Sequence, residues 1–410
     1  MTKLVKLLLV VLLFYVNIVN TVFPRMGDSV DTKWLVFYLL SLAFVLFVAM
    51  RRKIVVPGKW LIIIILFCSI VFLSILWSPF YSYDASTIIH FVARYIAPVL
   101  LVLIASNVIC DEKEFDFYTK NFTIVATIIG CIAIGQSLFF PASLKMSPEG
   151  FRATATFENP NTLAIFLVIA IPSVLNVIEH KLFPRLIGYG MLSLITISTI
   201  LTFSRKGIVT LTLCTLLYYF LKSYWKKFII LCLLTIIIIT TVTTLNSLSP
   251  RFNDRILERE WKGKINLAST GIAMFSINPL IGMGYLGYYE NFGKFTKNFE
   301  TKKYDAHNMY ITVLADQGIL GFIPFMSILL FPLFLSIKTW KNRDGFEKHI
   351  AIICITTIVP FMINGFYAGA MFVTQSIIFI FYAQVSICLT TIHIGKEKKN
   401  IGNCIRQTIK

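Results

Sequence analysis

The residues best suited to chemistry lie in the polar stretch 305–317, just before a long apolar run. His307 is the histidine of the largest polar segment, and Asp305 lies two residues before it. An imidazole can accept and release protons near neutral pH, so His307 is the candidate general base. Apolar residues then recur at helical spacing, which predicts a short amphipathic helix over 308–317 that Gly318 interrupts.

Cations near the same predicted surface are the second candidate feature. Arg205 and Lys206 lie in a very short turn between two apolar stretches, and Arg152 lies in a longer connection. Cations in tight turns on the outer side oppose the usual charge bias of membrane proteins, and an anionic ligand would explain them. Arg94 lies near the end of an apolar stretch, where it either extends to the interface or contributes to an anion site.

Two smaller motifs lie beside these cations. Asn159 or Asn161 can cap the helix that begins near Pro160. Gly282 and Gly284 belong to a G-x-G-x-x-G pattern, but no βαβ unit surrounds it, so a dinucleotide site is rejected. These glycines are expected to form a tight turn or to let a substrate approach the backbone.

Composition determines the class of protein that must position these residues. Of the 410 residues, 57% are hydrophobic and 14% are charged, with a mean hydropathy of +0.78, which predicts an all-α polytopic membrane bundle. The whole chain, 1–410, is expected to be one integral membrane domain. About twelve spans are predicted, near 4–23, 33–50, 59–77, 87–109, 121–140, 160–179, 186–204, 207–221, 228–245, 318–337, 350–366 and 370–391.

The distribution of charge predicts the orientation of the bundle. The net charge is +18, and alternate connections, counted from the N-terminus, carry most of the lysines and arginines. By the positive-inside rule both termini are cytoplasmic, and segment 246–317 is a large external loop that carries the catalytic segment. Since topology accounts for most of the basicity, no nucleic-acid partner is expected.

The external loop has its own features. It contains Arg255 and Lys264, and an amphipathic helix over 265–276 is predicted to lie on the membrane and to end at Asn278-Pro279. The first apolar stretch lacks a cleavage site and is expected to remain as a helix. Neither the histidines nor the eight cysteines show metal-site spacing, so no metal is expected.

Four motifs in order resemble the O-antigen ligase and O-antigen polymerase-like membrane glycosyltransferases. Each motif is weak alone, but their order over about residues 150–335 is specific. They are Arg152 followed by Phe157-x-Asn-Pro-Asn161, then Ser204-Arg205-x-Gly207, then Asn278-Pro-Leu-Ile-Gly-x-Gly284, and finally His307-Asn308-x-Tyr310 with Gly318-Ile-Leu-Gly321.

The resemblance implies a GT-C-like helical fold and a reaction without cofactor. Such enzymes transfer a glycan from undecaprenyl diphosphate to an acceptor hydroxyl at the outer face of the bacterial cytoplasmic membrane, without metal. The acceptor is lipid A-core in a ligase and a second lipid-linked glycan in a polymerase. By resemblance His307 is catalytic, supported by Asp305, Asn308, Asn161, Gly282 and Gly284, and the diphosphate is bound by Arg94, Arg152, Arg205, Arg255 and Lys264.

Lys264 departs from the pattern, because many relatives carry arginine where it aligns. Lysine keeps the charge but loses the bidentate fork, and Arg255 or Arg259 could supply it. The alternative function is a polytopic transporter or flippase for a lipid-linked or anionic substrate. Such a protein should carry ionisable residues at mid-depth, whereas these spans are nearly free of charge, which favours the enzyme.

Overall fold

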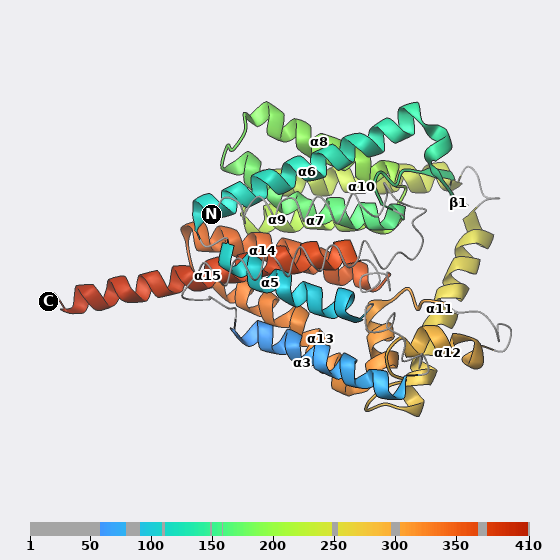
Figure 1. The fold of residues 1–410 in the computed structure, drawn as a ribbon. Coiled ribbons are helices and arrows are strands. Elements are labelled where there is room, and N and C mark those ends of the chain that lie inside the picture. Colours follow the sequence, from blue (N-terminus) through green and yellow to red (C-terminus); the bar gives the residue numbers. More distant parts are fainter. Residues whose placement is uncertain are drawn as a thin grey trace.

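The computed structural model describes most of the chain as a bundle of long helices (Figure 1). The residues that it describes are 58–78, 91–108, 111–147, 150–157, 159–247, 253–296, 304–367 and 375–408. The predicted spans 4–23 and 33–50 lie outside these residues.

The elements follow one another along the chain almost without strands. The helices are α3 (Gly58–Leu73), η1 (Ser74–Trp77), η2 (Val92–Ile96), α5 (Ala97–Val108), α6 (Glu112–Phe139), η3 (Pro141–Ser143), α7 (Pro160–Glu179), α8 (Arg185–Leu201), α9 (Arg205–Leu221), α10 (Trp225–Ser247), α11 (Asn253–Ile277), α12 (Gly287–Phe295), α13 (Met309–Asn342), α14 (Gly345–Gly365) and α15 (Gln375–Thr408). A short antiparallel hairpin, β1 (Lys145–Ser147) and β2 (Gly150–Arg152), is the one addition to the predicted all-α fold within the described residues.

Six helices of the described residues are long and apolar enough to cross a membrane by length and composition. They are Gly58–Trp77, Glu112–Phe139, Pro160–Glu179, Met309–Asn342, Gly345–Gly365 and Ile377–Ile394, and shorter apolar helices occupy Arg94–Asn107 and Arg185–Leu201. The predicted span 160–179 matches α7 to the residue, while the span predicted over 121–140 begins at Glu112. The chain is therefore an all-α membrane protein, although the structure does not account for all twelve predicted spans.

Helix α7 forms the centre of one half of the bundle. Every residue from 162 to 177 is buried, because α7 packs against α6, α8, α9, α14 and α15. In the other half, α13 packs against α3 and α14, and the indole of Trp60 donates to the carbonyl of Ile328 at 2.9 Å. An apolar helix buried on all sides needs no amphipathic pattern, which explains why α7 reads as uniformly hydrophobic.

Polar residues define where the helices begin. Asp111 accepts the amide N–H of Glu114 at 2.8 Å and caps α6, which explains the early start of that helix. Asn159 accepts the N–H of Asn161 at 2.9 Å and caps α7, with Pro160 in the first turn. Of the two candidate caps, the structure thus uses Asn159, and the side chain of Asn161 is available for other contacts.

Helix α11 crosses one end of the bundle at a steep angle to the long helices (Figure 1). The helix predicted over 265–276 ends where expected, at Ile277 before Asn278-Pro279, but it begins at Asn253. The hairpin β1–β2 and α12 lie at the same end of the bundle. This end therefore carries most of the structure that lies outside the long helices.

The loop after α11 is joined to α13 at the predicted break. Gly318 has non-helical torsion angles, φ 58° and ψ −161°, so the interruption predicted at this residue is confirmed. The N–H groups of Ile319 and Leu320 donate to the carbonyls of Pro279 and Leu280, at 2.9 and 3.1 Å. The loop therefore supplies the acceptors that a continuous helix would have provided.

Gly282 shows why this loop requires glycine. Its φ is +68°, and a Cβ there would lie 2.5 Å from the backbone carbonyl atoms of Asp316. We expect Gly282→Ala to destabilise the protein by about 2–4 kcal/mol, because it adds left-handed strain and a backbone clash. Thermal unfolding in detergent measures this loss.

The matched control is Gly190→Ala on α8, where a Cβ would meet no atom within 4 Å. There alanine should leave the unfolding temperature unchanged or raise it slightly, since helices favour alanine over glycine by about 0.5–1 kcal/mol. Equal unfolding temperatures for the two variants would contradict this account of the loop.

Candidate functional site

His307 lies in a tight turn immediately before α13. Its backbone is in the left-handed region, with φ 50°, which is uncommon for a residue other than glycine. The N–H of His307 donates to Asp305 Oδ1 at 3.3 Å, and Asn308 Oδ1 caps α13 by accepting from Tyr310 and Ile311 at 3.0 and 3.1 Å. The turn is thus fixed on both sides of His307, whose side chain remains accessible to solvent just before α13 although part of the ring is desolvated.

The surroundings of His307 lower its pKa. Partial burial is the largest cause, the cations of Lys206 and Lys264 lower the pKa further, and the carboxylate of Asp305 opposes them. The sequence alone could not decide between the cations and Asp305. In the structure burial and the two lysines prevail, so the imidazole is neutral at neutral pH, as a base must be.

We call Lys206, Lys264, Arg152 and His307 together the cation cluster. Lys206 belongs to it from the first turn of α9. Its ammonium donates to the backbone carbonyl of Tyr367, which follows α14. Burial lowers the pKa of Lys206 to about 8, with Lys264 and Arg152 adding to the effect and Asp305 opposing it. A half-buried ammonium whose pKa is also lowered by neighbouring cations is suited to an anion, because a bound anion would stabilise these positive charges.

Lys264 reaches the cluster from α11. Its ammonium lies 6.0 Å from the ring centroid of Tyr367, the residue whose carbonyl accepts from Lys206. The departure from arginine at this position therefore leaves a cation beside Lys206 and His307. A lysine here supplies a point charge, without the planar fork of a guanidinium.

Arg152 enters the cluster from the hairpin. Its side chain is 8% exposed, and its Nε donates to the carbonyl of Thr202 at 2.7 Å. Its Nη2 donates to Asn161 Oδ1 at 3.0 Å, and the hydroxyl of Ser204 donates to the same oxygen at 2.9 Å. Asn161 thus joins the hairpin to α7 and to the beginning of α9, which Ser204 caps.

A second polar cluster lies where the 279–288 loop meets α13. The carboxylate of Asp316 is buried and accepts the N–H of Tyr288 at 2.6 Å. Burial raises the pKa of the Tyr288 hydroxyl, and the carboxylates of Asp305 and Asp316 add to the rise. Asp305 therefore lies within electrostatic reach of both clusters.

The structure brings some predicted site residues together and separates others. Asp305 and Lys264 lie within electrostatic reach of His307, and Arg152, which donates to Asn161, lies within reach of Lys206. Arg94 instead lies near the phenol of Tyr285, beside the second cluster. The remaining predicted residues lie elsewhere. Arg205 is exposed in the first turn of α9, and Arg255 lies in α11 with its side chain outside the described part. Asn308 is a helix cap. Gly282 packs closely against the backbone of Asp316, and Gly284 against that of Ser74 and Ser78.

Lys206 was absent from the predicted ligands, although its neighbour Arg205 was among them. The sequence shows both cations in one tight turn, and this pattern indicates an anion site. It does not indicate which of the two side chains is directed into the protein. The side chains of adjacent helical residues point about 100° apart, and in the structure Lys206 is half-buried whereas Arg205 is exposed. Asp316 and Tyr288 were also missed, because their contact depends on how a distant loop packs.

The arrangement combines two chemical capabilities. Lys206, Lys264 and Arg152 present positive charge, and His307 presents a neutral imidazole beside them. Cations stabilise developing negative charge on a leaving group, and a neutral imidazole accepts a proton from an incoming hydroxyl. Displacement of an anionic leaving group by an alcohol uses both.

Comparison with known proteins adds an independent observation. Residues 190–326 match the family model described as O-Antigen ligase. No curated protein matches the chain. The matched segment runs from within α8 into α13 and includes Lys206, Lys264 and His307, whereas Arg152 and Asn161 precede it. This confirms the resemblance predicted from the motifs, because residues 190–326 are similar to the O-antigen ligase family.

Proposed function

We propose that this protein transfers a glycan en bloc from an undecaprenyl-diphosphate carrier to an acceptor hydroxyl. The reaction takes place at the outer face of the bacterial cytoplasmic membrane, and both termini are on the inner side. The observation that carries the proposal is that Lys206 and Lys264 act on His307, while Arg152 acts on Lys206. A family match to O-antigen ligases supports a role in glycan transfer.

The proposed reaction is a single displacement. The acceptor oxygen bonds to the anomeric carbon of the glycan, and the bond from that carbon to the diphosphate oxygen breaks. His307 takes the proton of the acceptor hydroxyl, and both electrons of the broken bond leave with the lipid diphosphate. Lys206, Lys264 and Arg152 neutralise the charge that develops on the departing oxygen.

The other predicted residues are proposed to act around this centre. Arg205, in the first turn of α9, and Arg255, whose backbone belongs to α11, are proposed as further diphosphate ligands. Arg94, near Tyr285, approaches the diphosphate from the side of the second cluster. Asp305 opposes the effect of the lysines on the imidazole, which keeps the base strong enough to accept a proton.

The acceptor defines two versions of this function. A ligase would use lipid A-core and a polymerase would use a second lipid-linked glycan. The test is transfer by purified protein in proteoliposomes, with a synthetic lipid-diphosphate glycan and each acceptor in turn. Product with one acceptor supports the corresponding version of the function. If the donor is not consumed with either acceptor, the proposal is overturned.

The two perturbed pKa values predict a bell-shaped dependence of kcat/KM on pH. His307 must be neutral to act as a base, so activity should fall only below its lowered pKa, under the ordinary value of 6.5. Lys206 must be charged to bind an anion, so activity should also fall above about pH 8. The measurement is kcat/KM for the donor from about pH 5 to about pH 10.

Lys206→Arg is the control for the alkaline side. A guanidinium stays charged throughout this range, so the fall above pH 8 should disappear while the acidic fall is retained. An alkaline fall unchanged in this variant would show that another group causes it.

A further inference from the structure

A cavity of about 340 Å³ lies at the other end of the bundle, outside the site described above. Its walls come from the end of α7, the beginning of α8, the end of α9 and the beginning of α10. In Figure 1 the turn between α7 and α8 is at the end of the bundle opposite β1 and α11. Under the proposed orientation this end faces the cytoplasmic leaflet.

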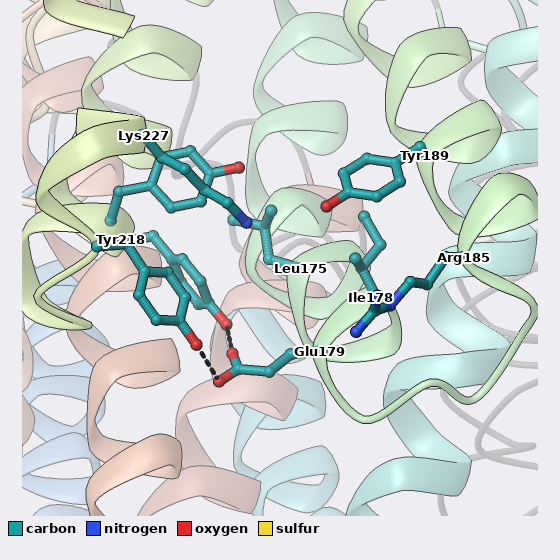
Figure 2. A pocket seen from close by; sticks show the side chains of 9 residues that line it. Leu175, Ile178, Glu179, Arg185, Tyr189, Tyr218 and Lys227 are labelled. Carbon is teal, nitrogen blue, oxygen red and sulfur yellow. Dashed lines mark hydrogen bonds between the residues drawn. The ribbon is translucent and has the colours of Figure 1, made fainter. Parts of the chain in front are cut away.

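Two cations line this cavity without acidic partners. Figure 2 shows the ammonium of Lys227 and the hydroxyl of Tyr189 pointing into the space between them, with the guanidinium of Arg185 below. Neither Arg185 nor Lys227 forms an ion pair with a carboxylate among the described residues. Arg185 also begins α8, where Pro184 provides no side-chain cap for the first-turn N–H groups.

The one carboxylate in the cavity wall is already neutralised. Glu179 accepts from the ammonium of Lys222 at 2.6 Å, and from the hydroxyls of Tyr218 and Tyr224 (Figure 2). It therefore offers little charge to a cationic ligand. Lys227 also lies over the ring of Tyr224, 5.3 Å from its centroid, so an ammonium already occupies that aromatic face. The cavity consequently favours an anion over a cation.

Apolar side chains are exposed on the two helices that carry these cations. Leu186 follows Arg185 and is 86% exposed, and Ile187, Trp225 and Ile229 are exposed on the same two helices, α8 and α10. In a membrane such side chains contact lipid, and tryptophan and tyrosine concentrate at the level of the head groups. The cations thus lie beside surfaces suited to acyl chains.

We infer that this cavity binds the head group of an anionic phospholipid, with the phosphate held by Arg185 and Lys227 and the acyl chains lying along α8 and α10. Basic pockets between membrane helices on the cytoplasmic side bind anionic head groups in this way. The site is separate from the His307 cluster, so the inference rests on the orientation in the proposed function but not on the reaction.

Native mass spectrometry of the detergent-solubilised full chain, titrated with phosphatidylglycerol, tests the inference. The variant Arg185→Gln/Lys227→Gln should weaken phosphatidylglycerol binding roughly 10- to 30-fold, since each cation near a head group contributes to the attraction. The matched control is Lys181→Gln/Lys226→Gln, which removes two exposed charges from the same two turns but outside the cavity wall. Equal binding by the two double variants would overturn the inference.

Two further arms identify the ligand. Phosphatidylcholine should bind much more weakly than phosphatidylglycerol, and equal binding of the two would overturn an anionic site. Inorganic phosphate should displace phosphatidylglycerol only at concentrations far above that of the lipid, and displacement at equal concentration would assign the cavity to a soluble phosphate instead. Thermal unfolding of each variant shows whether it is folded, and single substitutions at Arg185 and Lys227 replace the double variant if it is not.

Discussion

Replacing His307 with alanine is expected to reduce glycan transfer roughly 100- to 10,000-fold, the usual contribution of a general base. The acceptor hydroxyl would then have to lose its proton to water, which is a far weaker base. Binding of the lipid-diphosphate donor should be unchanged, because the proposed phosphate contacts come from Lys206, Lys264 and Arg152. The two quantities are measured on purified protein, turnover with a synthetic donor and donor affinity by equilibrium titration.

Two controls separate catalysis from structure. His393→Ala removes an exposed histidine from α15 and should leave transfer intact. Added imidazole should restore part of the activity of His307→Ala if the missing group is a base. Wild-type turnover in His307→Ala would remove the base assignment, and lost donor binding with a normal unfolding temperature would make His307 a substrate ligand.

Replacing Lys206 with alanine should lower kcat/KM for the donor about 100-fold, because a half-buried ammonium contributes more to phosphate binding than an exposed one. The loss should appear mainly in KM, since the charge contacts the donor before and during the reaction. Lys206→Arg should recover part of it by returning the charge.

The neighbouring residue provides the comparison. Arg205 is exposed, so Arg205→Ala should reduce kcat/KM less than Lys206→Ala does. Because Lys206 also binds the carbonyl of Tyr367, the unfolding temperature of each variant is measured beside its kinetics. A larger loss from Arg205→Ala in folded protein would reverse the assignment of the two cations.

The sequence predicted those features that depend on local pattern. The apolar run of α7, the break at Gly318 and the end of α11 at Ile277 all follow from composition, glycine and proline. The position of His307 just before a membrane-crossing helix follows in the same way. These signals act over one or two helical turns, so one chain carries enough information to read them.

Features that depend on packing could not be read in this way. The choice of Lys206 over Arg205 depends on the rotation of α9 about its axis, which α7 and α14 determine. The sharing of Asn161 Oδ1 by Arg152 and Ser204 joins three segments that are distant in the chain. The docking of the 279–288 loop on α13 likewise requires backbone contacts that composition does not encode.

The bond from Lys206 to the carbonyl of Tyr367 has a consequence for biosynthesis. Lys206 lies in the first turn of α9, whereas Tyr367 follows α14, so 161 positions of the chain separate donor and acceptor. Domains form from the N-terminus as the ribosome advances, and α9 is therefore made long before its partner. Translation has to pass residue 367, and α14 has to pack beside α9 and α13, before this contact can exist. The cation cluster is completed late, after most of the membrane helices have already been synthesised.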